Sequence, residues 1–174
     1  MLKPQDLLVL LKLCGCKDGQ RPSYTVLANE IGMSQSEVHA AVNRLKQARL
    51  LHGKEMNEKP RLKAIEEFII HGVKYFFPAE HSTYVRGMPT SYAAEPLNRL
   101  ISFGNDPIPV WPDPEGTERG IGLKPIYKSV PAAAKLDSLL YERLALVDAL
   151  RDGRAREREL AERELIKSLE QTHG

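Results

Sequence analysis

The chain of 174 residues has few of the features that mark secreted, membrane or metal-dependent proteins. It contains only two cysteines, Cys14 and Cys16, which can build neither a disulfide framework nor a four-ligand zinc site. Its longest uncharged apolar run, residues 68–73, is far shorter than the roughly 20 residues that a membrane helix requires. The first residues place a proline and an acid where a signal peptide needs a basic stretch and then an apolar one. We therefore expect a cytoplasmic protein with no membrane span.

Motifs for catalysis and cofactor binding are also missing. The five histidines lack the spacings of metal ligands, and the HExxH pattern does not occur. There is no GxGxxG turn, no phosphate-binding P-loop and no GxSxG run. The carboxylates near Trp111 lie in a stretch rich in proline, aspartate and glycine, which is typical of turns. We expect no enzymatic activity, no cofactor and no metal.

The formal net charge is only +2, but the charge is unevenly distributed. Residues 1–87 hold 13 basic and 9 acidic side chains, whereas residues 88–174 hold 12 and 14. Residues 34–63 hold seven basic and three acidic side chains, so this segment alone accounts for the positive excess of the first half. A local basic excess of this kind suits a polyanionic partner.

Three helices are predicted in the first 50 residues. The first covers about residues 4–13, with a proline tolerated in its first turn and a stripe of leucines. The second is short, with Ser23 as its N-cap and Gly32 where the chain must turn. The third opens at Ser34 and extends to about residue 49. Glu37 lies three residues after Ser34, which is the spacing of a capping box.

The second and third helices have the spacing of a DNA-reading helix-turn-helix. Ala28 is small where the helices would cross, and Gly32 can adopt the left-handed conformation that the turn needs. The outer face of the third helix is small and polar, which suits reading of the major groove because Asn and Gln pair with adenine and Arg pairs with guanine. The residues predicted to read bases are Gln35, Ser36, His39, Asn43 and Arg44, and those predicted to contact phosphates are Lys46, Lys54 and Lys63.

With these residues, the segment of about 1–90 resembles the winged helix-turn-helix transcriptional regulators, which include the MarR-like and IclR-like groups. The resemblance implies that residues 34–49 recognise DNA and that a β-hairpin wing touches the flanking minor groove. Two positions for the wing stay open. One is a short hairpin at residues 52–63, and the other is a displaced hairpin at residues 75–86, after a helix predicted at about 60–71.

The second half of the chain has a different character. Residues 88–131 contain 8 of the 12 prolines, so we expect a loop-rich segment that packs on the rest of the protein, with Trp111 as an anchor. Helical periodicity returns after this segment. The C-terminal residues then carry two apolar stripes with helical spacing, the first made of Leu136, Leu140, Leu144, Val147 and Leu150, and the second of Leu160, Ala161, Leu165 and Leu169. These stripes are predicted either to form a homodimer or to dock a partner protein.

Together these patterns predict a mainly α fold with a small β-hairpin. A winged helix-turn-helix domain would cover residues 1–90, and a proline-rich packed segment followed by C-terminal helices would cover residues 91–174. The predicted function is a sequence-specific regulator of transcription, a repressor whose homodimer binds double-stranded DNA at half-sites about one helical turn apart. The alternative is an antitoxin-type protein whose C-terminal half neutralises a partner enzyme, with or without repression of its own operon.

Overall fold

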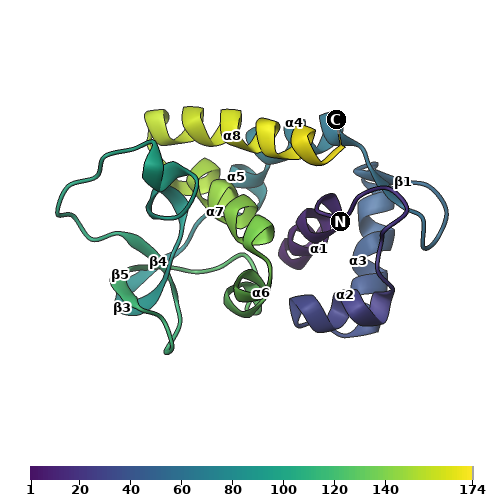
Figure 1. Ribbon diagram of the computed structural model, residues 1–174, viewed down its shortest axis with the longest axis horizontal. Coiled ribbons are helices and arrows are strands. Elements are labelled where there is room, and N and C mark those ends of the chain that lie inside the picture. Colours follow the sequence, from purple (N-terminus) through teal and green to yellow (C-terminus); the bar gives the residue numbers. More distant parts are fainter. Residues whose placement is uncertain (174) are drawn as a thin grey trace.

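The computed structural model describes residues 1–173 and is mainly helical with two small sheets (Figure 1). The α-helices are α1 (Pro4–Cys14), α2 (Tyr24–Ile31), α3 (Gln35–Gln47), α4 (Leu62–His71), α5 (Val73–Phe76), α6 (Val130–Leu136), α7 (Ser138–Asp152) and α8 (Ala155–His173). The strands are β1 (Leu51–His52), β2 (Lys59–Pro60), β3 (His81–Pro89), β4 (Pro109–Pro112) and β5 (Glu118–Leu123), and two short 3₁₀ helices are η1 (Ser91–Ala93) and η2 (Leu97–Arg99). This confirms the predicted fold class, a winged helix-turn-helix followed by a loop-rich region that ends in helices.

The helix-turn-helix forms because its local signals agree with its packing. Ser23 caps α2 by accepting a hydrogen bond from the backbone N–H of Val26. Gly32 ends that helix with a φ of 68°, in the left-handed region that favours glycine. At the start of α3, Ser34 Oγ accepts from the Glu37 backbone N–H at 3.2 Å, and Glu37 Oε2 accepts from the Ser34 N–H at 2.8 Å. These contacts confirm the predicted capping box.

The wing follows α3 directly. Strands β1 and β2 pair antiparallel, with Leu51 opposite Pro60 and His52 opposite Lys59. The prediction of a short wing near residues 52–63 is therefore confirmed, and the alternative hairpin at residues 75–86 is wrong. Residues 73–76 form the helical turn α5 instead, because Val73 is buried in the core and the tertiary contact outweighs the β-propensity of this aromatic run.

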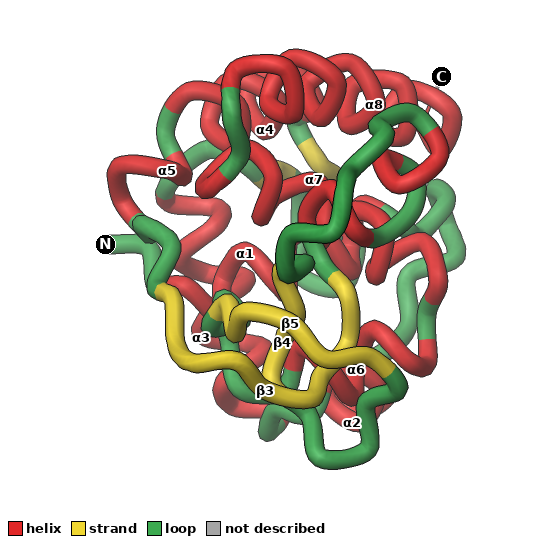
Figure 2. The backbone as a smooth tube through the Cα atoms, turned by 90° about the vertical axis from the view of Figure 1, so that its left-hand side faces the viewer, coloured by secondary structure: helices red, strands yellow, loops and turns green. Residues whose placement is uncertain are grey.

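The proline-rich segment contains more regular structure than the sequence predicted. Strand β3 pairs antiparallel with both β4 and β5, and β4 pairs parallel with β5. The three strands curve round one another at the end of the molecule opposite the wing (Figures 1 and 2). Trp111 is 1% exposed, and its Nε1–H donates to Asp148 on α7 at 2.7 Å. The tryptophan therefore anchors this segment to the helices, as predicted.

The two apolar stripes of α7 and α8 are buried within the chain itself. All members of the two stripes except Leu136 are at most 7% exposed, which are Leu140, Leu144, Val147 and Leu150 on α7 and Leu160, Ala161, Leu165 and Leu169 on α8. Leu136 is the exception, at 70% exposed. The stripes pack on the same hydrophobic cluster as the helix-turn-helix. The prediction that they form a homodimer or dock a partner is therefore wrong in this respect, since they are not accessible to a second chain.

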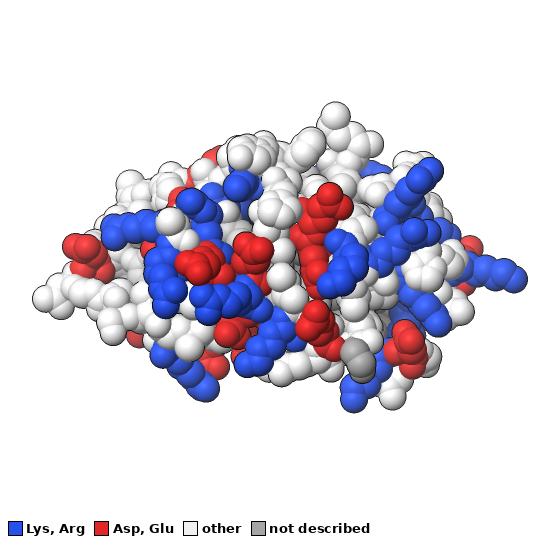
Figure 3. Space-filling model, turned by 90° about the horizontal axis from the view of Figure 1, so that it is seen from above, with Lys and Arg blue, Asp and Glu red and all other residues white. Residues whose placement is uncertain are grey.

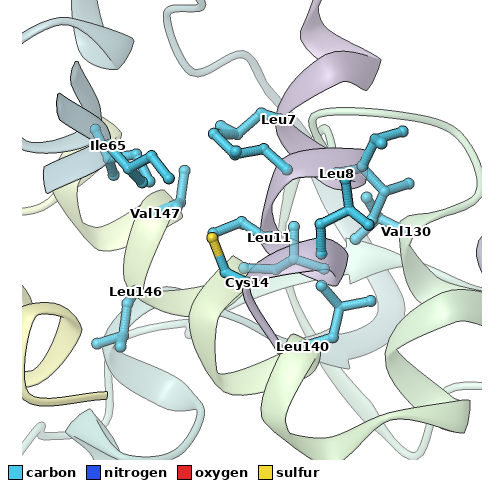
Figure 4. Packing of buried hydrophobic residues seen from close by; sticks show 14 of the residues in the cluster. Leu7, Leu8, Leu11, Cys14, Ile65, Val130, Leu140, Leu146 and Val147 are labelled. Atoms are coloured by element: carbon cyan, nitrogen blue, oxygen red, sulfur yellow. The ribbon is translucent and has the colours of Figure 1, made fainter. Parts of the chain in front are cut away.

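A single hydrophobic core joins the two halves, and α1 lies at its centre. Side chains of α1 meet Ile65 of α4, Val130 of α6 and Val147 of α7 in one continuous cluster (Figure 4). The cluster continues to Leu169 near the end of α8. The helix-turn-helix is therefore packed on the C-terminal helices and does not have a core of its own.

This shared core predicts that a fragment of residues 1–90 does not fold alone. Removing α7 and α8 would expose the apolar faces of α1 and α4 to water, at a cost of about 25 cal/mol for each Å² exposed. In thermal melts followed by circular dichroism, the full chain should unfold cooperatively and the fragment should show no transition. A cooperative transition together with well-dispersed amide resonances in the fragment would show that the first half is an autonomous domain.

Candidate nucleic-acid interface

The outer face of α3 is open to solvent at one end of the molecule (Figure 1). Gln35, Ser36, His39 and Asn43 are all exposed on it. The inner face is fully buried, and each of its side chains is 0% exposed: Val38, Ala41, Val42 and Leu45. Four of the five residues predicted to read bases therefore share one accessible surface, which we call the α3 face (Gln35, Ser36, His39 and Asn43).

Contacts within the α3 face hold its polar side chains in place. Gln35 Nε2 donates to Thr25 Oγ1 on α2 at 2.6 Å. Asn43 Nδ2 lies 3.4 Å from His39 Nδ1, one helical turn away. Ser36 Oγ lies 3.2 Å from the hydroxyl of the capping residue Ser34. Because these contacts are all at the surface, the same groups can exchange them for partners on a ligand.

Arg44, the fifth predicted reading residue, has a different environment. Its Nε and Nη2 donate to the two carboxylate oxygens of Asp6 on α1, at 2.8 and 2.7 Å. The Asp6 side chain is 1% exposed and that of Arg44 is 20% exposed. These hydrogen bonds raise the pKa of Arg44 above its usual value. The structure thus places Arg44 in a bidentate ion pair that fixes α3 to α1, outside the α3 face. A single aspartate among the leucines of the first helix was the sequence signal for such a buried partner.

The wing is fixed against α2 by a buried carboxylate that the sequence analysis did not identify. Glu58, whose side chain is 1% exposed, pairs with Arg21 Nε at 3.2 Å and accepts from Tyr24 Oη–H at 3.2 Å. The guanidinium of Arg21 also lies 4.7 Å from the centre of the Tyr24 ring. Nothing in the local sequence pattern indicates these pairs, because Arg21 and Glu58 are 37 positions apart in the chain.

The wing also contacts the α3 face. His39 Nε2 lies 3.1 Å from Glu55 Oε1 in the loop between β1 and β2, and the His39 ring packs edge-on against Tyr24. Lys54, predicted to contact phosphate, is exposed in the same loop. The wing and the α3 face therefore form one continuous surface.

The other two lysines predicted to contact phosphate lie in different settings. Lys46 is half-buried in the last turn of α3. Lys63, in the first turn of α4, is 84% exposed and pairs with Glu66 at 3.2 Å and Glu170 at 4.0 Å. Lys54 is thus the neighbour in the chain of Glu55, which contacts the α3 face, whereas Lys63 pairs with carboxylates of α4 and α8.

Basic side chains gather at the end of the molecule that carries α3 and the wing. In Figure 3 they predominate at the right-hand end, whereas acidic and basic side chains alternate across the middle of the view, along α8. This agrees with the basic excess of residues 34–63. A field of this sign attracts polyanions to the α3 face and the wing.

Among residues 1–173, no three His, Cys, Asp or Glu side chains are grouped so that they could hold a metal ion. Burial raises the pKa of Cys14 to about 12, so that this thiol stays protonated at neutral pH. Within the same residues, no helix has the length and apolar character to cross a bilayer.

Comparison with known proteins agrees with this geometry. Residues 1–51 match the family model of a helix-turn-helix domain, which spans α1, α2, α3 and the start of the wing. No curated protein and no solved structure matches the chain. The family model thus supports a helix-turn-helix domain in residues 1–51, the segment in which the structure shows α2, the Gly32 turn and α3.

Proposed function

We propose that the chain is a sequence-specific transcriptional regulator that binds double-stranded DNA. In this proposal α3 lies in the major groove and the wing contacts the flanking backbone. The main support for this proposal is the α3 face, which is polar and exposed, while the opposite face of the same helix is buried in the core.

The side chains of the α3 face match the chemistry of base edges. The amides of Gln35 and Asn43 each offer a donor and an acceptor, the pair that adenine presents in the major groove. Ser36 is small, so the helix can approach the bases closely at that position. Gln35 and Ser36 lie in the first turn of α3, the part of a recognition helix that contacts base edges.

Phosphate contacts would come from the wing and from the end of α3. Lys54 projects from the exposed wing loop, and Lys46 lies in the last turn of the helix. These contacts position the protein on the duplex without reading its sequence. The fixed wing, held by Glu58, makes the spacing between base and phosphate contacts rigid.

The regulator would act as a repressor by occupying a promoter, and a homodimer would read two half-sites about one helical turn apart. The dimer contact must lie outside the buried stripes of α7 and α8. The exposed aromatic side chains of α5, Tyr75 and Phe76, are 75% and 68% exposed and offer such a surface. In the antitoxin alternative the C-terminal half neutralises a partner enzyme, and the burial of the stripes removes the same support from that docking as from a homodimer formed through them.

Selection from a pool of randomised duplexes tests the proposal with the full chain. The protein should enrich one sequence motif, and its affinity should fall steeply between about 50 and 200 mM salt, because each neutralised phosphate releases counterions. Absence of an enriched motif and of salt-dependent binding would contradict the proposed function.

Replacing Asn43→Ala in the full chain should relax recognition at one base pair. Loss of a bidentate base contact costs about 1–3 kcal/mol of discrimination, or roughly 5- to 150-fold in the ratio of affinities. Competition binding with single-substitution duplexes measures this ratio. Asn98→Ala, an exposed change in η2, is the matched control and should leave the ratio unchanged. Equal ratios for the two variants would show that Asn43 reads no base.

Replacing Arg44→Ala should instead destabilise the fold. It leaves the buried Asp6 carboxylate without its charged partner and with only the hydrogen bond from the Lys3 backbone N–H, which costs about 3 kcal/mol or more in the free energy of unfolding. Asn43→Ala, next to it but exposed, should change that free energy by less than about 0.5 kcal/mol. Urea unfolding measures both. An Arg44→Ala variant of unchanged stability that loses preference at one base pair would make Arg44 a base-reading residue after all.

A further inference from the structure

A loop from the second half of the chain packs against the turn of the helix-turn-helix. Ser129, just before α6, donates from its hydroxyl to the backbone carbonyl of Ile31 at 2.6 Å. The turn glycine lies so close that a Cβ on Gly32 would be 2.9 Å from the Cβ of Ser129. The two segments are 98 residues apart in the chain. The loop therefore has a fixed position beside the first turn of α3.

Lys128 is an exposed basic residue of this loop. It precedes Ser129 directly in the chain, so the contact of Ser129 with Ile31 holds it beside the turn before α3. The hydrogen bond from the Ser34 backbone N–H lowers the pKa of Glu37 at the start of α3, and the charge of Lys128 acts in the same direction. Its Nζ lies 5.9 Å from the centre of the neighbouring Tyr127 ring. In the part of the chain that the structure describes, Lys128 forms no ion pair within 4.0 Å. Its charge is thus available to a ligand.

The loop and the wing lie on opposite sides of the α3 face. At about 100° per residue, Glu37 and His39 are roughly 160° apart across the exposed side of the helix, with Ser36 and Asn43 between them. His39 contacts Glu55 of the wing, and Glu37 is the residue on which the charge of Lys128 acts. On the wing side the exposed basic side chain is Lys54, next to Glu55, and on the other side it is Lys128.

We propose that Lys128 contacts a DNA phosphate on the side of the major groove opposite the wing. This rests on the proposed function. A helix in the major groove, which is about 12 Å wide, lies between two phosphate backbones. The wing, with Lys54, would contact one backbone, and Lys128 would contact the other. The C-terminal half of the protein then takes part directly in binding DNA, beyond the 51 residues that match the helix-turn-helix model.

The test is the affinity of the full-length Lys128→Ala variant for a selected duplex and for an unrelated one, measured over a range of salt concentrations. A phosphate contact carries no sequence information, so both affinities should fall by the same factor, about 3- to 10-fold, and the slope of log affinity against log salt should decrease by about 1. Lys167→Ala, an exposed change on α8, is the matched control and should alter neither quantity.

Each other outcome overturns a different statement. If the unaltered chain binds no duplex, both the proposed function and this contact are wrong. If it binds and Lys128→Ala keeps the same affinity and salt slope, only the contact is wrong. If Lys128→Ala weakens binding of the selected duplex alone, with an unchanged salt slope, the residue reads a base and the phosphate contact is wrong. Circular dichroism of each variant verifies that it is folded.

Discussion

The burial of α1 is the constraint on which the rest of the structure depends. Every residue from Asp6 to Cys14 except Lys12 is buried, so this helix has no free face and must be surrounded. Lys12, which is partly buried, also makes contacts on both sides, because its Nζ pairs with Glu30 of α2 at 3.1 Å and with Asp137, the N-cap of α7, at 2.8 Å. The helix-turn-helix packs on one side of α1 and the C-terminal helices on the other. The orientation of α3, and hence of any surface that it presents to DNA, is set by this helix.

The second half of the chain completes the core and holds α3 in place. The apolar stripes of α7 and α8 cover α1 and α4, and the small sheet is attached to α7 through the buried Asp148 carboxylate, whose pKa is raised by desolvation. The same half contributes the loop that contacts the turn before α3.

The sequence predicted what local chemistry determines and missed what distant partners determine. The capping box of Ser34 and the turn at Gly32 are encoded within four residues of each helix end, so α2 and α3 were predicted from the pattern. The wing was left open between residues 52–63 and residues 75–86. The first part of the strand-like run at residues 75–86 was misinterpreted because Val73 is buried by distant helices, whereas its second part does form a strand, in β3. The stripes of α7 and α8 were interpreted as an interface because an apolar stripe looks the same whether it covers another chain or its own. The pairing of Arg44 with Asp6 was missed for a similar reason: periodicity places a side chain on a face without naming its partner.

Mapping of the bound surface by NMR tests the central claim most directly. A ¹⁵N-labelled full-length chain is titrated with a duplex obtained by selection, and the backbone amide shifts are followed residue by residue. The account predicts the largest changes at residues 35–43 of α3 and at residues 52–58 of the wing, with only small changes along α8. Changes concentrated on α7 and α8, with α3 unaffected, would contradict it.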